Sequence, residues 1–336
     1  MKSTSRTKKI IIAVLIALVI IYNIAVNLMI SAALVPSFMR KLDAFERVTE
    51  QSYSEMVQTD DITENAAKVR EETKAFLDST ELIKVQCTSS DGYMLIASVF
   101  RQAEPEGRPW AILLHGYTGW KEEMYHHAVK YYERGFNVLC PDLRCQGESE
   151  GDYIGMGWTD RGDVLLWINM ILDSYPDADI VLQGESMGAS CALMLTGGDS
   201  EVSLPANVKC VISDCAYQDA MSMFSKQLKD WFGLPDLGFI SCGRLWLMIR
   251  GGYDLKDADA LAQVSKSTTP TLFIHGDQDK IVPQADQDAL YEACTAPKDK
   301  LTVPGAGHAQ SCLKAPTEYY DKIFDFIQAA GVEVAE

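Results

Sequence analysis

The sequence predicts an α/β fold in which a mostly parallel sheet is covered by helices on both faces, with a helical cap over the sheet edge. Three observations predict it. Short apolar runs alternate with longer helix-like segments from about residue 81 onward. A serine between glycines follows one of these runs and opens a helix-like segment. A charge-free apolar run, residues 10–30, precedes the whole pattern.

The short apolar runs are the strand candidates: residues 82–87, 93–100, 110–114, 136–140, 180–183, 208–213, 271–274 and 301–303. The first two flank the turn signal Ser89-Ser90-Asp91-Gly92 and predict a hairpin. Helix candidates follow at residues 121–134, 160–175, 187–195, 284–294 and 318–329. Because parallel neighbours need crossover connections, this alternation predicts a mostly parallel sheet.

One interval, residues 217–266, is too long for a simple crossover and is rich in methionine and aromatic side chains. It predicts a helical cap within a domain of residues 81–332. The apolar side chains of the cap either line an acyl or aryl pocket or bury a helix face. Residues 36–80 are mostly polar and predict a helical stalk or linker before that domain.

The run of residues 10–30 is long enough, as a helix, to cross a hydrocarbon core of about 30 Å. Four basic residues precede it, which predicts a cytoplasmic tail of residues 1–9 and a catalytic domain outside the cytoplasm. A cleaved signal peptide ending near Ser31-Ala32-Ala33 and a buried core helix are the alternatives. The run exceeds the roughly 7–15 residues of a signal-peptide core, so we expect a single-pass signal-anchor at residues 10–35 in the cell membrane.

Charge and cysteine content argue against a nucleic-acid-binding protein and against a zinc protein. A net charge of -17 repels phosphate backbones, so we expect no nucleic-acid partner. The nine cysteines contain no C-x-x-C pair, which gives a zinc site little support. Cys140, Cys191 and Cys210 lie in apolar stretches and predict buried thiols. So many cysteines fit an oxidising compartment poorly, and this conflicts with the predicted export.

The motif Gly184-Glu185-Ser186-Met187-Gly188 is the sharpest chemical signal. It follows an apolar run and opens a helix, the context of a nucleophile elbow, in which glycines allow a tight strand-to-helix turn. Ser186 is therefore the predicted nucleophile. The same string arises by chance, but rarely between a strand and a helix.

A serine hydroxyl needs a base, and with this elbow the base follows it in the chain. His275 and His308 are the histidines after Ser186. His308 lies in a glycine-containing loop after the last strand candidate and is the predicted base, whereas His275 ends a strand and packs locally. Asp279 is the predicted acid that orients the base, with Asp277 as the alternative. Asp277 is otherwise expected to stabilise its turn.

An acyl-transfer site also needs donors where negative charge develops. The loop His115-Gly116-Tyr117-Thr118-Gly119 follows the strand of residues 110–114. We expect the backbone amides of Tyr117 and Met187 to form an oxyanion hole. Read alone, the His115-Gly116 pair is also compatible with a simple strand-ending turn.

These motifs resemble those of bacterial α/β-hydrolase-fold serine hydrolases in the esterase and acylpeptidase-like branch. The resemblance covers about residues 82–329. The matching residues are His115, Gly116, Gly119, Asp142, Leu143, Arg144, Gly147, Ser149, the elbow, Asp279, Val282, Pro283, Gly307 and His308. It implies the α/β-hydrolase fold and the same triad. Cys145-Gln146 departs from the family's frequent Gly-His, which bears on substrate preference. Residues 151–161 resemble a membrane-anchored subgroup.

The sequence thus predicts hydrolysis of a small carboxylic ester through an acyl-enzyme, with no cofactor or metal required. A peptidase or acyltransferase using the same triad is one alternative, because the triad also cleaves amides or passes acyl groups to other nucleophiles. A non-catalytic, membrane-tethered binding protein is another.

Overall fold

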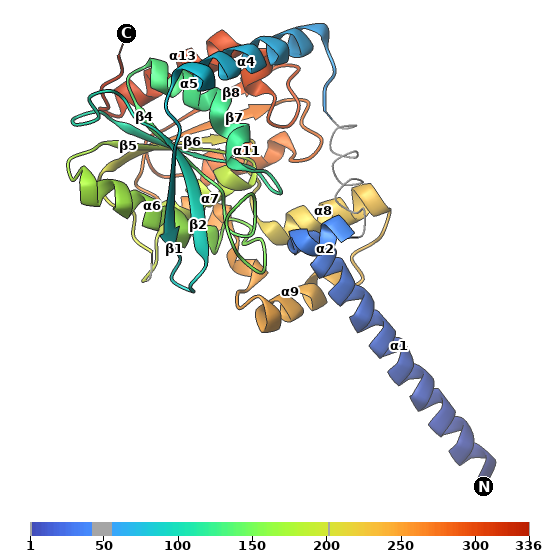
Figure 1. The fold of residues 1–336 in the computed structure, drawn as a ribbon. Helices are drawn as coiled ribbons and strands as arrows, with labels where there is room; N and C mark the ends of the chain where they lie inside the picture. Colours follow the sequence, from blue (N-terminus) through green and yellow to red (C-terminus); the bar gives the residue numbers. More distant parts are fainter. Residues whose placement is uncertain (1, 42–55, 201, 336) are drawn as a thin grey trace.

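The computed structural model describes residues 2–41, 56–200 and 202–335 and is organised around one eight-stranded sheet (Figure 1). The strand order is β1-β2-β4-β3-β5-β6-β7-β8. Strand β2 pairs antiparallel with β1 and β4, and every pairing from β4 to β8 is parallel. The strands are β1 Ile83–Thr88, β2 Met94–Phe100, β3 Trp110–Leu114, β4 Asn137–Pro141, β5 Ile180–Glu185, β6 Val208–Asp214, β7 Thr271–Gly276 and β8 Lys298–Val303.

The predicted mostly parallel sheet is confirmed, and each strand candidate becomes a strand. The hairpin closes at Gly92, whose φ of 92° favours glycine. The structure extends several strands beyond their apolar cores: β5 reaches Glu185, and β8 begins at Lys298 rather than at residue 301. Backbone pairing with β6 holds Glu185 in the ladder, and pairing with β7 holds the first residues of β8.

Helices cover both faces of the sheet. On one face lie α6 Asp160–Ser174, α7 Met187–Gly197, α10 Ala260–Val264 and α11 Gln284–Ala293. On the other lie α5 Tyr125–Glu133, α12 Ser311–Lys314 and α13 Pro316–Ala329, with the 3₁₀ turn η1 Lys121–Met124 before α5. Strand β3 shows the two-residue period of a buried strand: Ile112 packs into the first layer, and Ala111 and Leu113 pack into the second.

The long interval between β6 and β7 contains α8 Ala220–Phe232, α9 Phe239–Arg250 and the short turn η2 Leu255–Asp257. Helix α10, which the sequence placed in the cap, packs against α7 and so belongs to the layer that covers the sheet. We therefore restrict the name cap to α8, α9 and the loop between them.

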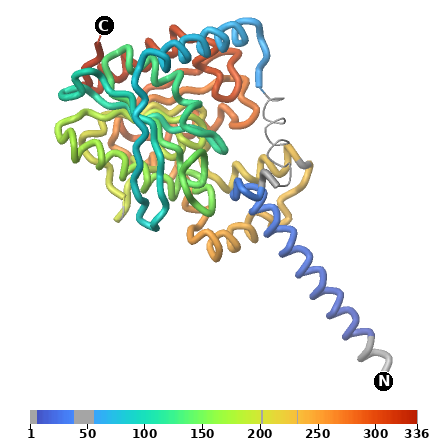
Figure 2. The backbone as a smooth tube through the Cα atoms, viewed as in Figure 1, coloured from blue at the N-terminus to red at the C-terminus, as the bar shows by residue number. Residues whose placement is uncertain are grey.

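Helix α1, Lys2–Leu34, projects from the domain and is followed by the short helix α2, Pro36–Lys41 (Figures 1 and 2). Within the described residues, Thr7–Leu34 is the helix long and apolar enough to cross a membrane. Its C-terminal third packs against α9, where Val26 is buried, and Leu34 is buried in the core of the domain. A Cβ on Gly243 of α9 would lie 3.2 Å from Cδ1 of Ile30, so glycine permits this close helix contact.

Helix α4, Asp60–Ser79, corrects the predicted stalk. It lies along the domain because Phe76 is buried against Phe100 and Tyr132, with ring centroids 4.9 and 5.2 Å away. The side chain of Asn65 also donates to the carbonyl of Leu313 at 2.8 Å. A single buried aromatic on a polar helix thus extends the packed domain to residues before 81. The predicted stalk at residues 42–55 lies outside the described residues.

Candidate active site

Ser186 occupies a strained turn between β5 and α7. Its φ of 52° and ψ of -115° are unusual for a residue with a side chain. A Cβ on Gly184 would lie 2.3 Å from the carbonyl carbon of Gly188, and one on Gly188 would lie 2.2 Å from the carbonyl oxygen of Leu114. Both flanking positions therefore exclude side chains, as the elbow motif predicts.

The structure brings the three predicted triad residues together. Nε2 of His308 lies 2.9 Å from Oγ of Ser186, and Nδ1 of His308 lies 2.7 Å from Oδ2 of Asp279. The second oxygen of Asp279 accepts the backbone N–H groups of Ile281 and Val282, each at 2.9 Å. Burial alone raises the pKa of Asp279, but the charge and hydrogen bonds of the nearby histidines hold it well below its ordinary value.

The two residues that the sequence set aside have local partners. Asp277 is exposed, and its side chain accepts the backbone N–H of Gly305 at 2.7 Å, a turn-stabilising contact. His275 is buried, and its Nε2 lies 2.9 Å from the carbonyl of Val282 and 3.3 Å from Oδ2 of Asp279. His275 therefore supports the acid, a contact that sequence reasoning missed. The sequence signal that could have revealed this contact is the position of His275, four residues before Asp279.

The loop after β3 lies beside the serine. A Cβ on Gly116 would be 3.5 Å from Cβ of Ser186, which places the start of the predicted oxyanion loop at the nucleophile. Met187 is the first residue of α7, so its amide is among those that a helix leaves without an intrahelical acceptor. The hydroxyl of Tyr117 points elsewhere, because it donates to the carbonyl of Ala33 in α1.

His115 is a structural residue. It is fully buried, and its Nε2 accepts the backbone N–H of Leu143 at 2.9 Å. Burial lowers the pKa of His115 to about 4, which keeps the ring neutral at physiological pH. The ring therefore ties the loop after β3 to the loop after β4.

Buried acids that the sequence did not identify lie next to the triad. Asp214 ends β6, accepts the hydroxyl of Tyr319 at 2.9 Å, and its carbonyl accepts the N–H of Ser186. Burial, and then the negative charge of Glu185, raise the pKa of Asp214 to about 7. Burial also raises the pKa of Glu185, whose Oε1 lies 2.8 Å from Nε2 of His127. The sequence signal for Asp214 and Glu185 was that each lies at the carboxyl end of a strand, and that the two strands are neighbours.

Among the residues that the structure describes, two groups of side chains have donor atoms close enough to hold a metal ion, with the donor atoms of each group within 4.8 Å of one another: His126, His127, Glu185 and Cys312, and Cys215, Asp279 and His308. In the first group both ring nitrogens of His127 already have partners, Glu185 and Tyr320, and those of His126 approach Glu123 and Cys312. The second group shares its aspartate and histidine with the triad. Both groups are therefore already hydrogen-bonded networks within the protein.

A residue from the predicted stalk also contacts the histidine loop. The side chain of Gln310 accepts the N–H of Val57 at 2.9 Å and donates to the carbonyl of Val57 at 3.0 Å. A Cβ on Gly307 would lie 3.2 Å from the side chain of Val57. Residues on both sides of His308 are thus braced by the segment that precedes α4.

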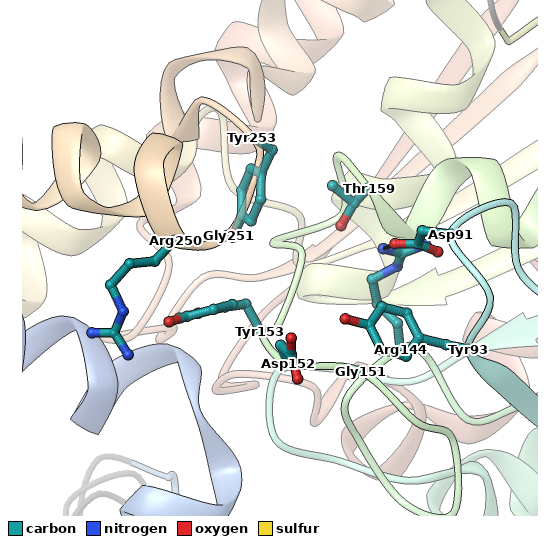
Figure 3. Close-up of a pocket in the computed structure, with 10 residues that line it drawn as sticks. All are labelled: Asp91, Tyr93, Arg144, Gly151, Asp152, Tyr153, Thr159, Arg250, Gly251 and Tyr253. Carbon is teal, nitrogen blue, oxygen red and sulfur yellow. Dashed lines mark hydrogen bonds and ion pairs between the residues drawn. The ribbon is translucent and has the colours of Figure 1, made fainter.

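The segment 151–161, singled out in the sequence, joins the domain to α1 and the cap. The N–H of Ile154 donates to the carbonyl of Leu34 at 2.9 Å, and the carbonyl of Ile154 accepts the hydroxyl of Tyr253 at 2.6 Å. A polar pocket of about 70 Å³ lies here (Figure 3). Its lining includes Tyr153 and Arg250, and Arg250 points toward α1, where it bonds Asn27.

Comparison with known proteins agrees with this geometry. A family model described as alpha/beta hydrolase fold matches residues 109–241, and a serine hydrolase (FSH1) model matches residues 180–309. An uncharacterized Bacillus subtilis protein, YqkD, is 26% identical over 217 residues, which cover 64% of this chain and 70% of YqkD. Protein bem46 of Schizosaccharomyces pombe is 24% identical over 256 residues, or 74% of this chain and 77% of bem46.

Solved structures share the fold. An esterase of Pyrococcus furiosus, Pf2001, is similar with a TM-score of 0.59 and 23% identity, over 75% of this chain and 92% of the esterase. The acylaminoacyl peptidase of Pyrococcus horikoshii also has a TM-score of 0.59, with 18% identity, over 78% of this chain and 43% of the peptidase. The family models span the elbow and the histidine loop described above. The chain therefore has the α/β-hydrolase fold, and its sequence is similar to serine hydrolases of that fold.

Proposed function

We propose that the protein is a membrane-anchored serine hydrolase that cleaves carboxylic esters through an acyl-enzyme intermediate. The observation that carries the proposal is the hydrogen-bonded chain from Ser186 through His308 to Asp279, with distances of 2.9 and 2.7 Å. A nucleophile, a base and an orienting carboxylate in this order are what acyl transfer by serine requires.

In the proposed mechanism, Oγ of Ser186 attacks the ester carbonyl while Nε2 of His308 takes its proton. Asp279 holds the imidazole through Nδ1 and stabilises its charged form. The amides of Tyr117 and Met187 donate to the oxyanion of the tetrahedral intermediate. His308 then protonates the departing alcohol, and a water molecule activated by the same imidazole releases the acid. These residues supply every proton transfer, so the reaction needs no metal or cofactor.

Contacts between α1 and the cap support an uncleaved anchor. Asn27 of α1 accepts from Arg250 at 2.7 Å, and Asn23 accepts from Trp246 at 3.3 Å. Cleavage after the small residues at 31–33 would remove both partners from the cap. With the basic residues of the tail in the cytoplasm, the catalytic domain lies on the outer side of the cell membrane.

Activity-based labelling tests the site. A fluorophosphonate probe should label the wild-type protein and leave Ser186→Ala unlabelled, because the probe forms its bond with an activated serine. Ser265→Ala, which changes an exposed serine, is the matched control and should label normally. Equal labelling of the wild type and Ser186→Ala would overturn the assignment. A folded wild-type protein that resists the probe would favour a binding protein.

Substrate class and topology need separate measurements. Faster release from p-nitrophenyl acyl esters than from aminoacyl anilides is expected, and the reverse order would favour a peptidase. Protease added to whole cells should digest the catalytic domain if it lies outside the cytoplasm. A fully protected domain, in cells whose outer surface is accessible to the protease, would contradict the proposed orientation.

A further inference from the structure

The cap exposes large apolar side chains next to α1. They are Leu234, Leu237, Leu245, Met248 and Ile249. The last three are spaced at i, i+3 and i+4 and so share one face of α9. Ile249 is 76% exposed and Leu237 72% exposed, more than any of the large apolar side chains described on α1. Apolar side chains grouped in this way on a surface mark a site of interaction.

Side-chain contacts fix α9 against the part of α1 nearest the domain. The rings of Tyr22 and Phe239 lie 5.0 Å apart, and Asn23 bonds Trp246. Farther along, Arg250 donates to Asn27 at 2.7 Å and to Ser31 at 3.2 Å. Helix α9 therefore runs beside residues 22–31 of α1, with its N-terminal end nearest Tyr22.

The length of a membrane span sets the depth of these contacts. Lys8 and Lys9 are the last charged residues before the apolar run. A helix rises about 1.5 Å per residue, so a core of about 30 Å extends from there to about residue 29. Residues 22–29 then lie in the half of the core nearest the catalytic domain. We propose that α9 and the loop before it insert into this leaflet, where their apolar face contacts lipid acyl chains.

The polar groups of α9 and the loop before it are compatible with this position. Residues 233–250 hold a single acidic residue, Asp236, and its Oδ1 accepts the N–H of Ile240 at the start of α9. Arg244 is paired with Asp254. Arg250 lies near the calculated edge of the core, where a long cationic side chain reaches the headgroup region. Each of these charges therefore has a partner within the protein.

The same geometry places the nucleophile at the membrane surface. Tyr117 contacts Ala33, near the end of α1, and its neighbour Gly116 lies against Ser186. This step rests on the proposed hydrolase function: the substrate is an ester whose acyl chain lies in the leaflet that holds α9.

Photo-crosslinking on the full chain tests the insertion. The photoreactive residue p-benzoylphenylalanine replaces Leu245 or Ile249, in protein reconstituted into phosphatidylcholine and phosphatidylglycerol vesicles. Ile16 of α1 is the positive control, and Leu77 of α4, across the domain from α9, is the negative control (Figure 1). Lipid adducts at residues 16, 245 and 249 but not at 77 are expected. Adducts at 16 without any at 245 and 249 would overturn the insertion and leave the anchor intact.

Activity on two esters tests the substrate class. Leu245→Asp with Ile249→Asp should slow hydrolysis of a long-chain ester embedded in vesicles by roughly tenfold, because charges in the inserted face oppose its contact with acyl chains. Hydrolysis of soluble p-nitrophenyl acetate should stay within about twofold of wild type. Leu77→Asp with Leu82→Asp makes the same charge change on exposed positions away from the cap and should alter neither rate.

The two proposals fail in different ways. Equal rates on the vesicle ester for the wild type and the cap variant would overturn the substrate class. A wild-type protein that hydrolyses neither ester, yet forms lipid adducts at residues 245 and 249, would overturn the hydrolase function and support the insertion.

Discussion

Oδ2 of Asp279 lies 2.7 Å from Nδ1 of His308, while the other oxygen of the same carboxylate accepts two backbone N–H groups. The carboxylate is therefore fixed at both oxygens. It can impose one ring orientation and one tautomer on His308, with Nε2 left to accept the proton of Ser186.

Asp279→Asn should lower kcat by about 10³- to 10⁴-fold, because an amide cannot stabilise the imidazolium or hold the correct tautomer. Asp277→Asn is the matched control, two residues away and equally conservative, and it should cost less than about threefold. Steady-state hydrolysis of a p-nitrophenyl ester measures both. If the two variants were impaired in the opposite order, Asp277 would be the acid.

Asp214 should make stability fall with rising pH. Its pKa is about 7 in the folded protein, whereas an Asp in an unfolded chain titrates near 3.9. The folded state holds the proton longer, so the stabilisation is complete below about pH 4 and is lost as pH rises through about 7. Asp214→Asn, which mimics the protonated form, should flatten this loss by up to about 4 kcal/mol.

Thermal unfolding in detergent between pH 4 and 8 measures the difference between the wild type and Asp214→Asn. Asp299→Asn is the control: Lys322 helps to hold the pKa of Asp299 below its ordinary value, so Asp299 stays ionised over this range and its variant should run parallel to the wild type. Stability from that pair is present above the unfolded pKa and is lost as pH falls. A wild type and an Asp214→Asn variant with parallel profiles would show that Asp214 is ionised throughout.

Gly188→Ala should prevent folding or destabilise the protein by more than about 3 kcal/mol, since its Cβ would lie 2.2 Å from backbone of β3. Gly162→Ala in α6 is the matched control. A Cβ there meets nothing within 4 Å, and alanine should stabilise the helix by up to about 1 kcal/mol. Soluble yield and the thermal midpoint distinguish the two, and a stable Gly188→Ala protein would contradict the tight elbow.

The residues that the sequence identified share one property: their chemistry depends on neighbours in the chain. The elbow around Ser186 and the glycine loop before His308 carry local signals, because a sharp turn needs glycines beside it. The parallel sheet was predictable for the same reason, since each buried strand is a short apolar run. The sequence connected the loop of Ser186 with the loop of His308 only through their order in the chain. That the two side chains lie within hydrogen-bonding distance is seen only in the structure.

The parts that could not be predicted depend on contacts between distant segments. In the sequence, Tyr22 and Asn23 only interrupt an apolar run, but in the structure both contact α9. Phe76 reads as one apolar residue on a polar helix, and its burial depends on Phe100 across the sheet edge. Asp214 reads as the polar end of a strand, and its raised pKa follows from burial beside Glu185.

The bond between Asn27 and Arg250 offers a test of whether α1 remains attached to the mature protein. Asn27→Leu and Arg250→Met each remove one partner, and the double variant removes both. Hydrogen bonds between membrane helices contribute about 0.6 kcal/mol on average. Thermal unfolding in detergent of all four proteins, purified from cells, should therefore give a coupling of about 0.5–1 kcal/mol between the two positions.

This coupling arises only if residue 27 is still present beside the cap. Cleavage near residues 31–33 would leave Arg250 without Asn27, and Asn27→Leu would then have no effect on the purified protein. Ile16→Leu, a change at an exposed position of α1, controls for general effects on the helix and should leave the midpoint unchanged. Zero coupling together with a purified chain that lacks its first 30 or so residues would establish a signal peptide, and the cap would then need another partner for its apolar face.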